Sequence, residues 1–146
     1  MERQERREQI LNILAAGIRK VLLNKVPKPE ELQEIRMRLG QPLRVVRGKE
    51  EIVLRSGTEP YIVTKEELRE TMDYISHYSL YAYENELRQG FVTVEGGHRV
   101  GVAGKVIMEK ERVKNIQYIS SLNIRVSHEV LGCADRLIPY IVANKQ

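Results

Sequence analysis

The stretch FVTVEGGHRVGVAGKVIM, residues 91–108, predicts the centre of the fold of this chain. Apolar residues recur at alternate positions on both sides of Gly96-Gly97, which is the period of a strand with one buried face. A glycine pair between two such runs favours a tight turn, so the stretch predicts an antiparallel hairpin. The residues that we expect to face the core are Val100, Val102 and Val106.

The same stretch contains Gly104-Lys105, the pair of residues that closes a nucleotide-binding P-loop. A P-loop has the pattern G-x-x-x-x-G-K-[ST], because its backbone N–H groups surround the phosphates, its lysine neutralises them and its hydroxyl binds Mg²⁺. Here Arg99 replaces the first glycine and Val106 replaces the hydroxyl residue, and no other Gly-Lys-Ser or Gly-Lys-Thr occurs in the chain. We therefore expect these glycines to leave the strand backbone bare for close packing.

Two helices are expected before this hairpin. Thr64 followed by Glu67 forms a capping box, which predicts a helix over 65–77. A second, short helix is expected between Ser79 and Gly90, because serine caps helix N-termini and glycine ends helices. The apolar residues along one face of the first helix are Leu68, Met72 and Ile75.

An antiparallel meander is expected still earlier in the chain. Ile35, Met37 and Leu39 alternate with two arginines, as in a half-buried strand, and Gly40-Gln41-Pro42 follows as a turn. The remaining strands are expected over 43–46, 51–54 and 113–127, and a last helix is expected to begin near 133–135.

The chain begins with a predicted amphipathic helix over 8–24, because its apolar residues recur with the 3.6-residue helical period. Pro27 and Pro29 then stop it. We therefore divide the chain into an N-terminal helix, residues 1–27, and an α+β domain, residues 30–146. The expected fold class is α+β, with a mostly antiparallel sheet and helices packed on it.

Composition narrows the class of protein. The chain has 146 residues, of which 42% are hydrophobic and 30% charged, and this suits one soluble domain with a single core. No run approaches the roughly 20 apolar residues of a membrane span, so we expect no direct membrane insertion. The single cysteine, Cys133, excludes an intrachain disulfide and suits the cytoplasm. The formal charge of +4 is too small to indicate nucleic-acid binding by itself.

Catalytic and metal-binding patterns are missing from the sequence. The histidines lack the spacing of metal ligands, and no G-x-S-x-G pattern is present, so we expect neither a metal site nor a catalytic residue in this chain. Four clustered tyrosines could stack on bases, although packing in the core or against a partner is the commoner use. They are Tyr74, Tyr78, Tyr81 and Tyr83.

Arginines are the more informative residues. Arg36 and Arg38 are expected to share a strand face, and Arg99 and Arg125 each lie within an apolar strand. A guanidinium group there needs an acid, a phosphate or a partner chain, unless it lies on the solvated face of the strand. As a group, these four arginines suggest an anionic neighbour.

Three motifs, taken in order, resemble one family. They are EIRMRLGQPL, YAYENELRQGFVTVEGGHRVGVAGKV and ISSLNIRVSHEVLGCADRLIPYI, which together reach from about Glu31 to Ile141. The chain resembles the N-terminal region of the stage III sporulation protein AA family, sporulation ATPases that are similar to type II and type IV secretion ATPases. Those secretion ATPases are hexameric motors whose subunits join an N-terminal α+β domain to a C-terminal RecA-like ATPase domain.

The resemblance implies a function and a place in the cell. It implies a regulatory and assembly domain of an ATPase that powers a secretion-like channel complex between mother cell and forespore. Its P-loop, ATP and Mg²⁺ are expected beyond Gln146, so this chain alone is expected to hold no cofactor and to lack ATPase activity. The implied partners are its own ATPase domain, neighbouring subunits of a hexamer and a membrane protein of the channel complex. The implied location is the mother-cell cytoplasm, at the membrane only through partners.

The resemblance also implies roles for two arginines. In the secretion motors, arginines of the N-terminal domain reach the nucleotide site of a neighbour and complete it, since a positive charge near the γ-phosphate stabilises the transition state. Arg99, in Gly-His-Arg-Val-Gly, and Arg125, in Asn-Ile-Arg-Val-Ser, match that region by their motifs. We take both as candidate contacts to a neighbouring ATP site.

Two other functions stay open on the sequence alone. The basic charge, Arg36 and Arg38, and the tyrosine cluster would suit a module that binds single-stranded nucleic acid, although we do not expect nucleic acid as a partner. The basic residues of the first helix would also suit a membrane surface, although packing on the sheet or on a neighbouring subunit explains its apolar face more simply.

Overall fold

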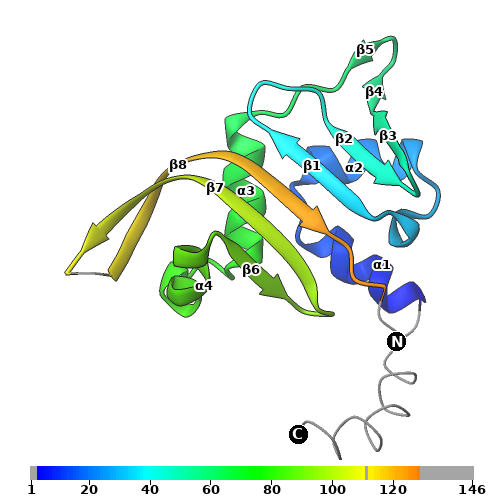
Figure 1. The fold of residues 1–146 in the computed structure, drawn as a ribbon. Coiled ribbons are helices and arrows are strands. Elements are labelled where there is room, and N and C mark those ends of the chain that lie inside the picture. Colours follow the sequence, from blue (N-terminus) through cyan, green and yellow to red (C-terminus); the bar gives the residue numbers. More distant parts are fainter. Residues whose placement is uncertain (1–2, 111, 129–146) are drawn as a thin grey trace, which may run out of the picture.

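The computed structural model describes residues 3–110 and 112–128, and within them the chain forms an α+β fold. A six-stranded antiparallel sheet has the strand order β3-β2-β1-β8-β7-β6, and the helices pack against it (Figure 1). The fold class predicted from the sequence is therefore confirmed. The strands are β1 Glu34–Arg38, β2 Arg44–Arg47, β3 Glu50–Val53, β6 Phe91–Val94, β7 His98–Glu109 and β8 Arg112–Arg125, and a separate short hairpin consists of β4 Arg55–Ser56 and β5 Glu59–Pro60. The helices are α1 Arg3–Asn12, α2 Ala16–Lys25, α3 Lys65–Ile75 and α4 Glu84–Gln89, with 3-10 turns η1 Pro29–Glu31 and η2 Leu80–Tyr83.

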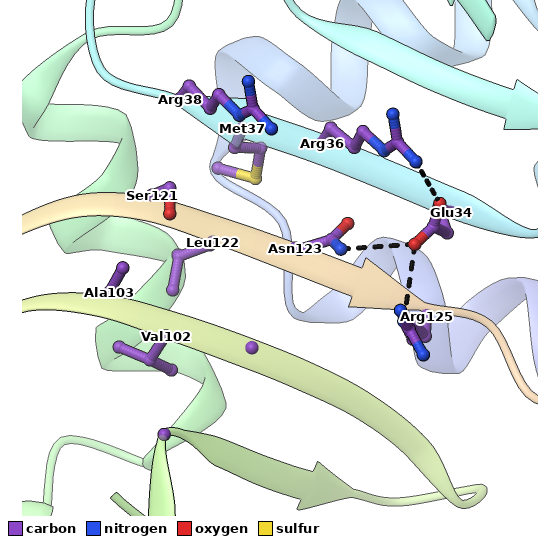
Figure 2. A pocket seen from close by; sticks show the side chains of 12 residues that line it. Glu34, Arg36, Met37, Arg38, Val102, Ala103, Ser121, Leu122, Asn123 and Arg125 are labelled. Carbon is purple, nitrogen blue, oxygen red and sulfur yellow. Dashed lines mark hydrogen bonds and ion pairs between the residues drawn. The ribbon is translucent and has the colours of Figure 1, made fainter.

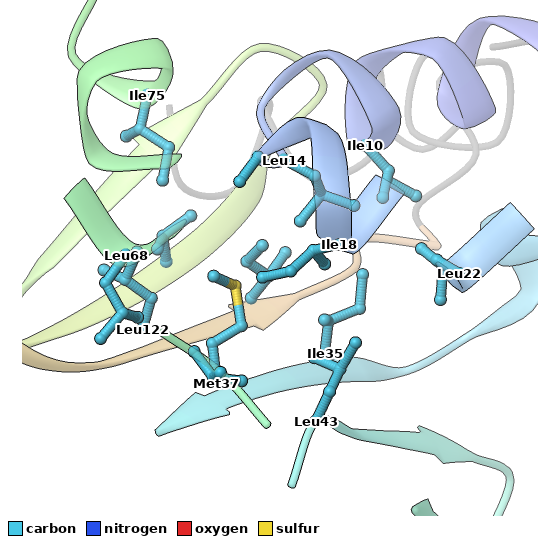
Figure 3. Packing of buried hydrophobic residues seen from close by; sticks show 14 of the residues in the cluster. Ile10, Leu14, Ile18, Leu22, Ile35, Met37, Leu43, Leu68, Ile75 and Leu122 are labelled. Carbon is cyan, nitrogen blue, oxygen red and sulfur yellow. The ribbon is translucent and has the colours of Figure 1, made fainter. Parts of the chain in front are cut away.

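One hydrophobic cluster lies between the sheet and the helices (Figure 3). Alternate residues of the strands point into it, and the residues between them lie on the opposite face of the sheet. The fully buried side chains drawn together in Figure 3 include Ile10, Leu14 and Ile18 from the N-terminal helices, Ile35 and Met37 from β1, Leu68 and Ile75 from α3, and Leu122 from β8. The N-terminal helices therefore share one core with the sheet.

Most predicted elements are confirmed. The meander β1-β2-β3 forms as expected, and α3 begins with the predicted capping box of Thr64 and Glu67. The second helical unit ends at Gly90, whose φ of 88° is the left-handed conformation that favours glycine. The hairpin of β6 and β7 turns at the glycine pair, and Val100 is fully buried as expected. Val102 is partly buried and packs against the core. The side chain of Val106 and the helix expected near 133–135 lie outside the described part of the chain.

The single helix predicted over 8–24 is wrong, because the chain forms two helices with a break between them. The N–H of Ala15 donates to the Thr71 hydroxyl at 2.9 Å, and the N–H of Ala16 donates to the Glu70 carboxylate at 2.9 Å. These two side chains of α3 bind the first N–H groups of α2, which a continuous helix would have used internally. Tertiary hydrogen bonds therefore begin a new helix at this point.

Arg19 stabilises the same break from the other side. Its Nε donates to the carbonyl of Leu11 at 3.0 Å, and a terminal nitrogen donates to the carbonyl of Leu14 at 2.9 Å. Carbonyls at a helix C-terminus have no partner within the helix and carry partial negative charge, so a guanidinium suits them. Arg19 lies in α2 and therefore joins the start of that helix to the end of α1.

Strands β7 and β8 continue past the rest of the sheet as a two-stranded arm (Figure 1). Their pairing has three register shifts, and the first lies between Ala103 and Gly104. A Cβ atom at Gly104 would lie 2.1 Å from the carbonyl oxygen of Tyr118, so a side chain there would collide with the backbone of β8. The bare backbone predicted for the glycine-rich stretch is confirmed at Gly104, whereas Gly101 has room for a methyl group, its nearest atoms being 3.9 Å away.

Candidate functional site

Charged side chains of β1, β2, β3, β7 and β8 gather on the sheet face opposite the helices. We call it the arginine face and define it by five arginines and two glutamates, whose positions alternate with the buried residues of their strands. They are Glu34, Arg36 and Arg38 on β1, Arg44 on β2, Glu51 on β3, Arg99 on β7 and Arg125 on β8. The prediction that Arg36 and Arg38 share a strand face is confirmed.

The two candidate nucleotide-sensing residues lie side by side on this face. Arg99 on β7 pairs in register with Arg125 on β8, and Arg125 pairs in turn with Glu34 on β1. The Arg99 guanidinium lies 4.2 Å from the centre of the Phe91 ring, a cation–π contact. The Arg125 side chain is 71% exposed, and its Nε is 3.4 Å from a Glu34 oxygen. Both positive charges are therefore accessible from one direction.

Glu34 organises the centre of the arginine face. Its carboxylate accepts hydrogen bonds from Arg36 at 2.8 Å and from the Asn123 amide at 3.2 Å, and pairs with Arg125 (Figure 2). Burial alone would raise the pKa of Glu34, but these hydrogen bonds and the charges of Arg36 and Arg125 outweigh it, so its pKa lies below the usual value. The hydrogen bond to Glu34 correspondingly raises the pKa of Arg36, which also pairs with Glu51.

A hollow of about 450 Å³ opens on the arginine face beside Glu34 (Figure 2). Its rim includes Arg36, Arg38 and Arg125, and small side chains of β7 and β8 lie between them. Sequence reasoning missed Glu34 and Asn123. The signal for Glu34 was present, because it precedes Arg36 and Arg38 by two and four residues and so falls on their face of the strand.

The tyrosine cluster lies at a different place from the arginines. Tyr74, Tyr78 and Tyr83 line a second hollow of about 390 Å³ near α1 and the C-terminal end of α3. The rings of Tyr74 and Tyr78 meet edge to face with their centres 6.3 Å apart. Among the described residues that line the first hollow there is no tyrosine. The arginines of that hollow therefore do not lie beside Tyr74, Tyr78 or Tyr83, and the side chain of Tyr81 lies outside the described part.

His98, next to Arg99, is fully buried and joins three segments. Its Nδ1 accepts the backbone N–H of Ser127 at 2.9 Å, so its Nε2 carries the proton that faces Gln9 Oε1, 3.0 Å away. Burial lowers the pKa of His98, and the charges of Arg6 and His128 lower it further. The neutral ring thus connects α1, the start of β7 and the chain that follows β8.

Residues 3–110 and 112–128 contain no group of three or more His, Cys, Asp or Glu side chains that could hold a metal ion. Within the same residues, no helix is long and apolar enough to cross a membrane. Cys133 lies outside this part of the chain. The arginine face, with its paired arginines and its hollow, offers recognition of negative charge.

Comparison with known proteins connects this fold to one family. The family model described as "Sporulation stage III, protein AA" matches residues 4–146. The chain is 36% identical over 138 residues to stage III sporulation protein AA of Bacillus subtilis (strain 168), an alignment that covers 93% of this chain and 43% of the relative. The chain thus spans less than half of the length of that relative. No solved structure matches the chain.

Proposed function

This chain belongs to the sporulation stage III protein AA family, and from this premise we propose that it is the N-terminal regulatory and assembly domain of a sporulation ATPase. The complete protein would power a secretion-like channel complex between mother cell and forespore. ATP and Mg²⁺ would bind in a RecA-like domain outside this chain. The observation that carries the proposal is the register pair of Arg99 and Arg125, two exposed arginines on a face that no described helix covers.

The two arginines would act on a nucleotide held by a neighbouring subunit. Positive charge near the γ-phosphate stabilises the negative charge that develops during phosphoryl transfer, and most strongly where the interface excludes water. The ion pair of Arg125 with Glu34 suits this role, because Arg125 is largely exposed and its Nε lies 3.4 Å from the carboxylate, so a closer charge-assisted hydrogen bond to phosphate can replace this contact. Glu34 would hold Arg125 in place until a phosphate replaces it.

The proposed partners follow from the same arrangement. The arginine face would lie against the protein's own ATPase domain or that of a neighbouring subunit, in a ring of six. A membrane protein of the channel complex would recruit the ring, on the mother-cell side, to the membrane. As part of this proposal, the domain itself would stay in the cytoplasm.

ATP turnover of a longer protein tests the proposal. The experiment compares the 146-residue chain with a version extended beyond Gln146 by about 160 residues, roughly one further domain. We expect ATP binding and hydrolysis only in the longer protein. In that protein, Arg99→Ala and Arg125→Ala should lower kcat by about 10²-fold, the loss typical of removing one preorganised donor, while size-exclusion profiles stay unchanged.

Arg47→Ala is the matched control. Arg47 is an exposed arginine of the same sheet, and its place in β2, three residues after Arg44, puts it on the opposite face from the arginine face. It should leave turnover unchanged. Normal turnover in both the Arg99 and Arg125 variants, with assembly intact, would show that these arginines do not serve a nucleotide site. ATP hydrolysis by the short chain alone would contradict the assignment of catalysis to a domain outside this chain.

A further inference from the structure

The second hollow lies where α1, the end of α3, η2 and the edge strand β6 meet. We call it the tyrosine hollow and define it by Tyr74, Tyr78 and Tyr83, together with Glu95 and Asn12. Its volume of about 390 Å³ is within the usual range of binding pockets. Among the described residues, none lines both this hollow and the one on the arginine face, so the two hollows can bind different molecules.

The backbone at the end of α3 holds Tyr78 at the tyrosine hollow. His77 has a φ of 51° and Tyr78 a φ of 62°, and this left-handed conformation costs about 1–2 kcal/mol for a residue other than glycine. The Tyr78 N–H donates to the carbonyl of Asp73 at 2.8 Å, and its ring meets that of Tyr74 edge to face. Tyr78 is nevertheless 73% exposed. A large ring that is held in a strained conformation and lies mostly in water adds little to folding, so its position indicates a contact with another molecule.

Two polar side chains of the tyrosine hollow are also free to bind a ligand. Glu95 directly follows β6 and makes no ion pair or hydrogen bond with any residue that the structure describes. The side-chain amide of Asn12, at the end of α1, likewise has no partner within the described part of the chain. Both residues are exposed. One ligand can therefore reach a carboxylate, an amide and an aromatic ring.

The charges of the tyrosine hollow favour a positively charged ligand. Glu95 is the one acidic residue among the described residues that line it, and none of these is a lysine or an arginine. Glu8 lies one helical turn before Asn12 and adds negative charge to the same side of α1. Arg6 and Arg19 are nearby, but neither lines the hollow, and carbonyls of the α1–α2 break bind the Arg19 guanidinium. The hollow therefore attracts a cation and repels a phosphate.

An arginine side chain fits these groups best. The face of a tyrosine ring attracts cations, and the planar guanidinium can stack on it while its N–H groups donate to a carboxylate. The amide of Asn12 offers one acceptor and two donor hydrogens, which suit the N–H and C=O of a peptide unit. These requirements are met together by an arginine within a polypeptide.

We propose that the tyrosine hollow binds an arginine-bearing segment of a partner protein. The guanidinium of the segment lies over the ring of Tyr78 and donates to Glu95, and the amide of Asn12 bonds the main chain beside it. Because the chain has a net charge of +4, it does not attract basic segments in general, and binding depends on these local groups. The site goes beyond the nucleotide contacts of Arg99 and Arg125 and does not depend on them.

The test is an NMR titration of the ¹³C,¹⁵N-labelled 146-residue chain with a blocked tetra-arginine peptide. We expect chemical-shift changes at the Tyr78 ring, the Asn12 side-chain amide and the Glu95 backbone amide, and none with an uncharged tetracitrulline peptide. Glu95→Gln should weaken binding about tenfold, which is about 1.4 kcal/mol and close to the contribution of one charge-assisted hydrogen bond. Tyr78→Leu should weaken it about threefold, whereas Tyr78→Phe keeps the ring and should bind like the parent chain. Both side chains are exposed, so these replacements should leave the fold intact.

Glu59→Gln is the matched control, because it removes the same charge from an exposed glutamate of β5 that does not line the tyrosine hollow. It should bind the peptide like the parent chain, and weakening equal to that of Glu95→Gln would overturn the proposal by showing attraction to net charge alone. The absence of shifts at millimolar peptide, or full affinity of Tyr78→Leu, would overturn it too. Tighter binding of an eight-residue oligothymidylate to the same residues would assign the hollow to nucleic acid instead. Self-association of the free chain that Glu95→Gln abolishes would assign it to a second copy.

Discussion

Replacing Thr71 by valine tests why the N-terminal helical segment divides into two helices. Thr71 and Ala15 are both fully buried, and the Ala15 N–H donates to the threonine hydroxyl at 2.9 Å. Valine keeps the shape of threonine but cannot accept a hydrogen bond, so the substitution leaves a buried N–H without a partner. That loss costs about 1–3 kcal/mol, a large fraction of the roughly 5–15 kcal/mol that stabilises a typical domain.

Urea unfolding followed by far-ultraviolet circular dichroism measures this change. The free energy of unfolding of Thr71→Val should fall by about 1–3 kcal/mol, and Tm should fall by about 2–4 °C for each kcal/mol in a chain of this size. Thr71→Ser is the control, because it keeps the hydroxyl and loses one methyl group. Hydrogen exchange separates the two variants, since the Ala15 amide should lose protection only with valine. A Thr71→Val variant that is as stable as the parent, with a protected Ala15 amide, would refute this account of the break.

Three further perturbations have defined outcomes. Burial lowers the pKa of His98, so this side chain takes up a proton less readily in the folded chain than in the unfolded chain. The free energy of unfolding should therefore fall as the pH drops below about 6.5. His98→Gln should flatten this pH dependence in unfolding curves taken across that range. His77 has a φ of 51° after α3, where glycine is favoured, so His77→Gly should stabilise the chain by about 1 kcal/mol in thermal unfolding. Gly104→Val should destabilise the β7–β8 arm and speed its amide exchange, whereas Gly101→Ala should be tolerated.

A helix or strand could be predicted from the sequence where the residues that make its stabilising contacts lie close together in the chain. The capping box of α3 is an example, because Thr64 and Glu67 lie three residues apart and bind one another's backbone. The break between α1 and α2 is the opposite case. Its hydrogen bonds come from Glu70 and Thr71, more than fifty residues away, and no periodicity within residues 8–24 could reveal them.

The candidate site was predictable only in part for a similar reason. Two-residue alternation placed Arg36 and Arg38 on one face, and the same reasoning applied to Glu34 would have found the counterion of Arg36. Alternation could not show that Arg36 has two carboxylate partners while Arg38 has none among the described residues. That difference depends on Glu51, which the meander brings beside Arg36 from the edge strand β3.

The pairing of Arg99 with Arg125 shows how strongly a site can depend on irregular structure. At the tip of the arm, Glu109 pairs with Arg112, so a regular hairpin would pair Arg99, ten residues back, with Leu122. Leu122 is fully buried, and Arg99 would then have to face the core. The three register shifts each add one residue to β8, which moves the partner of Arg99 from Leu122 to Arg125. The buried Leu122 and Ile124 and the pairing with β1 hold the register of β8 at the core, so deleting one residue of β8 between 112 and 120 should remove one register shift from the arm and leave Arg99 opposite Arg125. In the longer protein, such a deletion should leave ATP turnover near that of the parent, and a fall as large as that of Arg99→Ala would show that the arm, and not the core, sets the pairing of the two arginines.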